Sequence, residues 1–166
     1  MGECGSKPLS GTASTAESPD GLLLNVTSNP ANLAPVRRAC EAFCRRQGLD
    51  DAALADVGLC VNEAMANVTR HAYGGATDRP VRVTAEALDG GGAVVPDGDP
   101  AARRVRVTIR DWGTGVNPLA LPARQRDPLQ PGGLGLVCLR ELLDGVAFEP
   151  QADGGMRLVM EKARKC

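Results

Sequence analysis

The stretch that decides the fold reads VNEAMANVTRHAYGG and spans residues 61–75. Its apolar residues continue a stripe that begins near Leu54 and repeats every three or four positions, which predicts a helix that is capped by Asp50 or Asp51 and ends near Ala72. Glu63 and Asn67 stand one turn apart on this helix, so a carboxylate and an amide oxygen point the same way. Oxygen ligands of this kind suit Mg²⁺, which takes one or two protein groups beside phosphates and water.

Two glycine-containing segments expose backbone at the ends of other elements. In IRDWGTGV, residues 109–116, Asp111 closes a strand before a sharp Gly-x-Gly turn, and its carboxylate can accept a hydrogen bond from an amino group such as that of adenine. In GGLGL, residues 132–136, the glycines open a helix whose first N–H groups can bind an anion. Taken singly, the three segments are also compatible with a solvated helix face, an ordinary turn and close helix packing.

Working outward, the flanking patterns predict an α+β fold. The order of elements favours a two-layer α/β sandwich, with a mixed, mostly antiparallel sheet and the helices on one face. Period-two alternation, helical periodicity and turn residues predict strands at 22–26, 81–87, 104–110, 146–148 and 156–160, and further helices at 30–47 and 134–143.

The domain boundaries follow from composition along the chain. Residues 1–20 are small and polar and predict a flexible tail, residues 21–162 form the domain, and 163–166 are a short C-terminal tail. The segment 89–103 predicts a long mobile hairpin tip. The proline-rich segment around 116–131 is too long for a plain connection and is a candidate lid.

Composition narrows the class of protein. The chain of 166 residues has 20 Gly, 12 Pro and only four aromatic residues, so the core must consist of aliphatic side chains. A net charge of −1 disfavours nucleic acid as a direct partner, and the chain shows neither a membrane-spanning run nor a signal sequence, which favours the cytoplasm. Six cysteines without a CxxC pair are expected to be reduced thiols, and Cys40 and Cys44 to be core residues of one helix face.

Together, and in this order, the three segments resemble the boxes of the GHKL ATPase superfamily, whose fold is the Bergerat type. VNEAMANVTRHAYGG, IRDWGTGV and GGLGLVCLRELLDGVAF look like the anti-sigma regulatory factor serine/threonine kinases of bacterial partner-switching systems, over about residues 22–162. No Walker A motif and no full G-x-G-x-x-G competes. Histidine kinases, topoisomerases and chaperones of the superfamily need further domains, so the stand-alone kinase is the favoured interpretation.

The resemblance implies a role for each matching residue. Asn67 would hold the Mg²⁺ that bridges the ATP phosphates, and Glu63 would act as the general base. Asp111 would bind the adenine amino group. The four glycines of the boxes would let backbone approach the purine or cradle the phosphates: Gly113, Gly115, Gly133 and Gly135.

Further expectations concern residues near the boxes. Arg124 and Arg126 in the lid are candidates for contact with the γ-phosphate, although solvated loop charges are the alternative. His71 and Tyr73 match the end of the family's helix and are expected to be structural or to line the pocket. Met156 departs from the family, whose last strand often begins Gly-Thr beside the nucleotide.

The resemblance implies an ATP-dependent kinase that phosphorylates a small anti-sigma-factor antagonist and sequesters a sigma factor. A nucleotide-dependent binding module without phosphotransfer is the alternative, and a structural domain with a dead pocket is the third interpretation. A homodimer is compatible with the family, and a monomer fits equally well.

Overall fold

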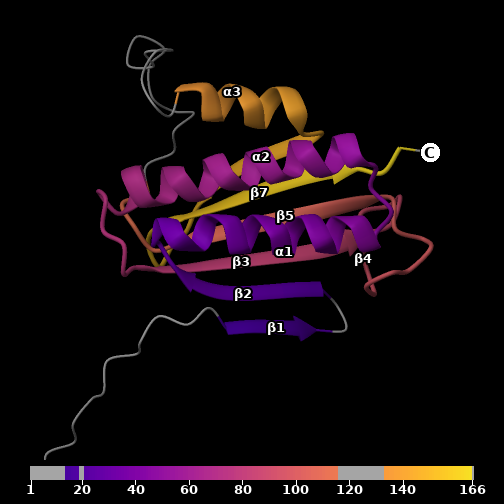
Figure 1. Ribbon diagram of the computed structural model, residues 1–166, viewed down its shortest axis with the longest axis horizontal. Coiled ribbons are helices and arrows are strands. Elements are labelled where there is room, and N and C mark those ends of the chain that lie inside the picture. Colours follow the sequence, from indigo (N-terminus) through magenta and orange to yellow (C-terminus); the bar gives the residue numbers. More distant parts are fainter. Residues whose placement is uncertain (1–13, 19–20, 116–132, 166) are drawn as a thin grey trace, which may run out of the picture.

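The computed structural model describes residues 14–18, 21–115 and 133–165, and it shows one sheet with helices packed along it (Figure 1). A 3₁₀ turn at Pro30–Asn32 precedes the first helix, and a π-helical turn at Val68–Ala72 follows the second. The elements are β1 (Ser14–Ser18), β2 (Gly21–Thr27), α1 (Leu33–Arg46), α2 (Asp51–Asn67), β3 (Pro80–Leu88), β4 (Val94–Val95), β5 (Arg104–Asp111), α3 (Gly133–Leu142), β6 (Gly145–Pro150) and β7 (Met156–Ala163).

The sheet has the strand order β1-β2-β3-β5-β7-β6, with β4 paired to β3 beside this path. Every strand pair of the described residues is antiparallel. The predicted α+β class and mostly antiparallel sheet are therefore confirmed, although no parallel pair appears in this part of the chain to make the sheet mixed. Because β7 lies between β5 and β6, the start of the last strand sits beside the end of β5.

Alternation along the strands turns one face of the sheet toward the helices. Val81, Val83 and Ala85 of β3 are buried on that face, whereas Arg82 between them is exposed. The core is aliphatic, as the composition predicts, with Phe43 as its one fully buried aromatic side chain among the described residues. The cysteines of the described residues are free thiols, and Cys40 and Cys44 are buried in the core.

The helices begin where the sequence predicts. The Asn29 side chain accepts a hydrogen bond from the Ala31 N–H at 2.9 Å before α1, and the Asp50 carboxylate accepts one from the Ala53 N–H at 2.8 Å at the start of α2. In Figure 1 α1, α2 and α3 run side by side, with α2 in the middle. None of the helices in the described ranges is long and apolar enough to cross a membrane.

Two expectations about the ends of the chain are wrong. Residues 14–18 belong to the predicted tail, yet they form β1 and pair with β2 from Ser14↔Asn25 to Ser18↔Gly21. An edge strand is held by backbone hydrogen bonds and needs no apolar face, so the missing periodicity did not reveal it. At the other end, β7 continues through residue 163, one residue into the predicted C-terminal tail.

The hairpin tip at 89–103 is anchored, contrary to the expectation of a mobile segment. Val95 of β4 pairs with Ala87 of β3. The Asp97 carboxylate accepts hydrogen bonds from the Arg46 guanidinium at 2.9 and 3.0 Å and from the Gln47 amide. These contacts, the Arg46 hydrogen bond first, hold the pKa of Asp97 below its ordinary value. The tip is therefore fixed to the end of α1.

Candidate functional site

The first part of the candidate site lies on the C-terminal half of α2. Glu63 and Asn67 are half-buried and stand one turn apart, as predicted. Asn67 is the last α-helical residue, and the helix then widens into the π turn at Val68–Ala72. The Thr69 hydroxyl stabilises this turn by donating to Ser28 O at 2.7 Å. Single π turns inside helices frequently mark functional positions.

Gly135 of α3 packs directly against these two side chains. A Cβ atom placed on Gly135 would lie 2.8 Å from Glu63 Oε2 and 3.4 Å from Asn67 Nδ2. Any side chain at this position would therefore displace the carboxylate. Gly133 is the first residue of α3, as the predicted helix start requires. The first turn of α3, whose N–H groups have no partner within the helix, thus meets the polar end of α2.

The chemistry of Asn67 fits a magnesium ion. Its Oδ1 atom is buried and has no hydrogen-bond partner in the described structure. A buried amide oxygen without a donor is costly, and a cation with phosphate and water ligands would satisfy it. No cluster of three or more His, Cys, Asp or Glu side chains occurs in the described residues.

Asp111 occupies the end of β5, where the sheet meets the end of α2. The residue is only 4% exposed, and its Oδ1 accepts a hydrogen bond from the Gly113 N–H at 2.9 Å. Burial raises the pKa of Asp111, while the backbone N–H groups of Gly113 and Met156 and the Arg110 charge oppose this rise. The site therefore holds a desolvated carboxylate at the place where the sequence predicts the adenine contact.

The glycines after Asp111 permit close backbone approaches. A Cβ atom on Gly113 would lie 2.3 Å from Ala72 O, so the loop after β5 touches the last residue of the π turn. Gly115 has φ +68° and comes within 3.1 Å of Gly155 O by the same measure. The chain thus brings the end of α2, the end of β5 and the start of β7 to one corner of the sandwich.

Tyr73 is structural, as predicted. Its hydroxyl donates to Pro80 O at 2.7 Å and accepts from the Trp112 N–H at 2.8 Å, so it ties the end of the π turn to β3 and β5. Burial raises the pKa of this phenol. His71 is exposed to solvent.

Two residues of this corner have contacts that the sequence did not indicate. Gly155 has φ +74° and lies so close to the Asp111 backbone that a Cβ would come within 2.1 Å of Asp111 O. Arg110 is buried beside it although strand alternation predicts an exposed side chain. The Gly154-Gly155 pair was a usable signal for a tight turn, whereas Arg110 carried none.

Several expected features lie outside the described residues. These are the lid around 116–131 and its candidate phosphate contacts Arg124 and Arg126.

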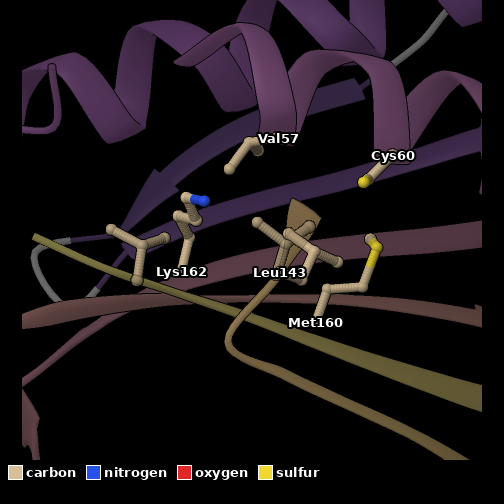
Figure 2. A pocket seen from close by; sticks show the side chains of 7 residues that line it. Val57, Cys60, Leu143, Met160 and Lys162 are labelled. Atoms are coloured by element: carbon tan, nitrogen blue, oxygen red, sulfur yellow. The ribbon is translucent and has the colours of Figure 1, made fainter. Parts of the chain in front are cut away.

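A small cavity lies between α2 and the sheet, away from the boxes (Figure 2). Its volume is about 10 Å³, room for about one water molecule. At its rim the Lys162 ammonium donates to Asp56 Oδ2 at 2.8 Å and to Leu142 O at 2.5 Å, which joins α2, the end of α3 and β7. The cavity is lined by Val57, Cys60, Val105, Val107, Leu143, Met160 and Lys162. It is too small and apolar for a nucleotide.

Comparison with known proteins identifies a family and two relatives of this chain. The family model of the histidine kinase-like ATPase domain matches residues 26–162. Anti-sigma F factors from two strains of Clostridium botulinum, Eklund 17B / Type B and Alaska E43 / Type E3, are each 25% identical to this chain over 143 residues. These alignments cover 84% of this chain and 91% of each relative.

A solved structure is also similar. The histidine kinase domain of the blue-light activated histidine kinase from Erythrobacter litoralis EL346 aligns with a TM-score of 0.42 and 16% identity, over 91% of this chain and 66% of that chain. The chain spans just under two thirds of that structure's length.

The resemblance drawn from the three segments is confirmed by the family model, which covers all of them and most of the sheet. The family is one of ATPases, which implies ATP as the ligand of the domain. On this match the chain belongs to the family of histidine kinase-like ATPase domains.

Proposed function

We propose that this protein is an ATP-dependent serine/threonine kinase that acts as an anti-sigma factor: it phosphorylates a small antagonist protein and binds a sigma factor. The observation that carries the proposal is the contact of Gly135 with Glu63 and Asn67, whose buried Oδ1 has no hydrogen-bond partner among the described residues. The similarity to anti-sigma F factors over 84% of the chain supports the choice of partner class.

Each half of the site would hold one part of the nucleotide. Asp111 would accept a hydrogen bond from the adenine amino group, and Gly113 and Gly115 would let the purine settle against backbone. The N–H groups at the start of α3, from Gly133 to Gly135, would bind phosphate oxygens. When bound, Mg²⁺ would supply charge neutralisation between phosphate groups, and Asn67 Oδ1 would be its protein ligand.

Glu63 would accept the proton of the attacking serine or threonine hydroxyl. The hydroxyl oxygen forms a bond to the γ-phosphorus, the bond from that phosphorus to the bridging oxygen breaks, and ADP leaves with the electron pair. Phosphoryl transfer depends mainly on positioning and charge neutralisation, so a domain with few catalytic side chains suffices.

The test is incubation of the protein with Mg-ATP and antagonist proteins from the same genome. Phosphoserine or phosphothreonine on one of them is expected. Glu63→Gln should abolish transfer and keep ADP binding. The matched control Glu86→Gln alters a carboxylate on the helix-free face of the sheet and should leave transfer unchanged. Nucleotide binding without transfer to any antagonist would refute the kinase.

The alternative of a nucleotide-dependent binding module gives a different result. In that case Glu63→Gln would keep both partner binding and regulation, because no chemistry is needed.

Calorimetric titration with ATP and ADP in the presence of Mg²⁺ tests the third interpretation, the dead pocket. Absence of binding, with no rise in melting temperature, would refute both nucleotide-dependent functions.

A further inference from the structure

Arg110 is buried on the face of the sheet that carries no helix. Its side chain is 11% exposed, whereas that of Arg106, four residues earlier on the same face of β5, is 33% exposed. Both pair with an acidic residue, so ion pairing alone does not explain the difference. Arg110 is buried because the turn before β7 and the Trp112 ring lie against it.

The Arg110 guanidinium joins the end of β5 to that turn. One nitrogen donates to Asp153 Oδ1 and to Gly154 O, each at 2.7 Å. The other donates to Asp111 O and, at 3.4 Å, to Met156 O. A planar guanidinium can make these bonds together because its donors point in fixed directions, which the single ammonium of lysine cannot reproduce.

The Trp112 indole ring lies against the Arg110 guanidinium. The Arg110 guanidinium carbon lies 4.6 Å from the indole ring centre, and the Trp112 indole N–H donates to Asp153 Oδ2 at 3.3 Å. Arg82 stands 5.7 Å from the same ring. Asp153 thus receives hydrogen bonds from both Arg110 and Trp112, which flank Asp111 in the sequence.

The turn and Asp111 are in direct contact. Gly155 touches the Asp111 backbone so closely that even a methyl group would not fit. The Gly113 N–H donates to Asp111 Oδ1 at 2.9 Å, and the Met156 N–H nearby opposes the rise that burial causes in the pKa of this carboxyl. Because Gly155 is packed against the Asp111 backbone, a shift of the turn would shift the carboxylate with it.

We propose that Arg110 is a positioning residue for recognition of the nucleotide base: by holding residues 153–156 against the end of β5, it fixes the direction in which the Asp111 carboxylate accepts. The inference rests on the proposed function, because it assigns the base to Asp111. In this proposal Arg110 acts on the base through Asp111 and the adjoining turn.

Base discrimination distinguishes positioning from general stabilisation. Adenine presents an amino group at C6, whereas guanine presents a carbonyl oxygen, which a carboxylate repels. In Arg110→Met we expect the Kd for ATP to rise about tenfold, the effect of weakening one hydrogen bond to a charged group. The Kd for GTP should change less than about twofold, so the preference for ATP falls about tenfold.

Arg106→Met is the matched control, since it removes an ion-paired arginine from the same face of the same strand. It should keep the wild-type ratio of the two Kd values. If Arg110→Met does not fold, Arg110→Lys and Asp153→Asn replace it in the test. Arg110→Lys retains a donor, and Asp153→Asn alters only an exposed carboxylate. Both should lower the ATP preference by a smaller factor and shift the emission of Trp112, the only tryptophan of the chain.

The outcomes separate the two proposals. If the wild-type chain prefers ATP and both Arg110→Lys and Asp153→Asn keep that preference unchanged, the role of Arg110 is refuted and the kinase proposal stands. Equal losses of ATP and GTP affinity would also refute it, because they indicate general loosening. If the wild-type chain binds neither nucleotide, the proposed function fails and this inference fails with it.

Discussion

Asp111→Asn tests the assignment of the base-binding carboxylate with little change in shape. The carboxylate offers two acceptor oxygens, and Oδ1 accepts from the Gly113 N–H at 2.9 Å. An asparagine can keep that bond with its one oxygen, but its NH₂ group then faces the adenine amino group as a second donor. The variant loses one hydrogen bond to a charged group, worth about 1.5–3 kcal/mol, so the Kd for ADP should rise about 10- to 150-fold.

The same substitution that weakens ADP binding should not lower the free energy of unfolding, and its effect on that free energy depends on pH. Burial raises the pKa of Asp111 in the folded chain, so between its ordinary and its raised value the folded state holds a proton that the unfolded state has released. The free energy of unfolding of the wild-type chain therefore falls as the pH rises through this window, and the asparagine variant lacks this loss. At neutral pH we expect Asp111→Asn to be about as stable as the wild type or more stable.

Calorimetric titration with Mg-ADP and urea unfolding at about pH 4 and pH 7 measure the two effects. The difference in unfolding free energy, variant minus wild type, should be more positive at pH 7. Unchanged ADP affinity would remove Asp111 from the nucleotide site. A difference that becomes more negative with rising pH would show that the carboxylate is stabilised by its surroundings, which would refute the argument from burial.

Three further predictions concern the surroundings of this residue and the core. Gly155→Ala should lower the free energy of unfolding, measured by urea unfolding, by more than about 2 kcal/mol, because its Cβ would collide with Asp111 O and its φ of +74° is unfavourable for alanine. A loss within about 0.5 kcal/mol would contradict this close contact. Met156→Thr should lower the Kd for ADP about tenfold, because it places a hydroxyl beside Asp111, and should lower the free energy of unfolding by about 1–3 kcal/mol, because a buried side chain becomes smaller. Unchanged affinity would show that the hydroxyl is not needed here. Burial raises the pKa of Cys44 and of Cys60 to about 12, so at pH 8 a thiol reagent should label neither residue in the folded chain and both in denaturant. Peptide mapping assigns the labelled sites, and fast labelling of either residue in the folded chain would contradict its burial.

Much of the fold was predictable because its signals are local. The Asp50 cap and the apolar stripe located α2, and alternation located β3 and β5. The same sequence brought Glu63 and Asn67 to one side of a helix, since residues four apart in a helix share a face whatever surrounds them. The edge strand β1 was missed, because its pairing with β2 needs only backbone groups that every sequence has.

The sequence by itself determined the chemistry of the candidate site: a carboxylate and an amide one turn apart, and glycines where backbone must come close. Only the tertiary structure decided which groups meet. Placing β7 between β5 and β6 sets Gly155 against Asp111, and packing of α3 on α2 sets Gly135 against Glu63. Arg110 shows the same limit, since alternation predicts an exposed side chain and a turn more than 40 residues later buries it. Contacts between distant segments depend on how the whole chain packs, and no local period records them.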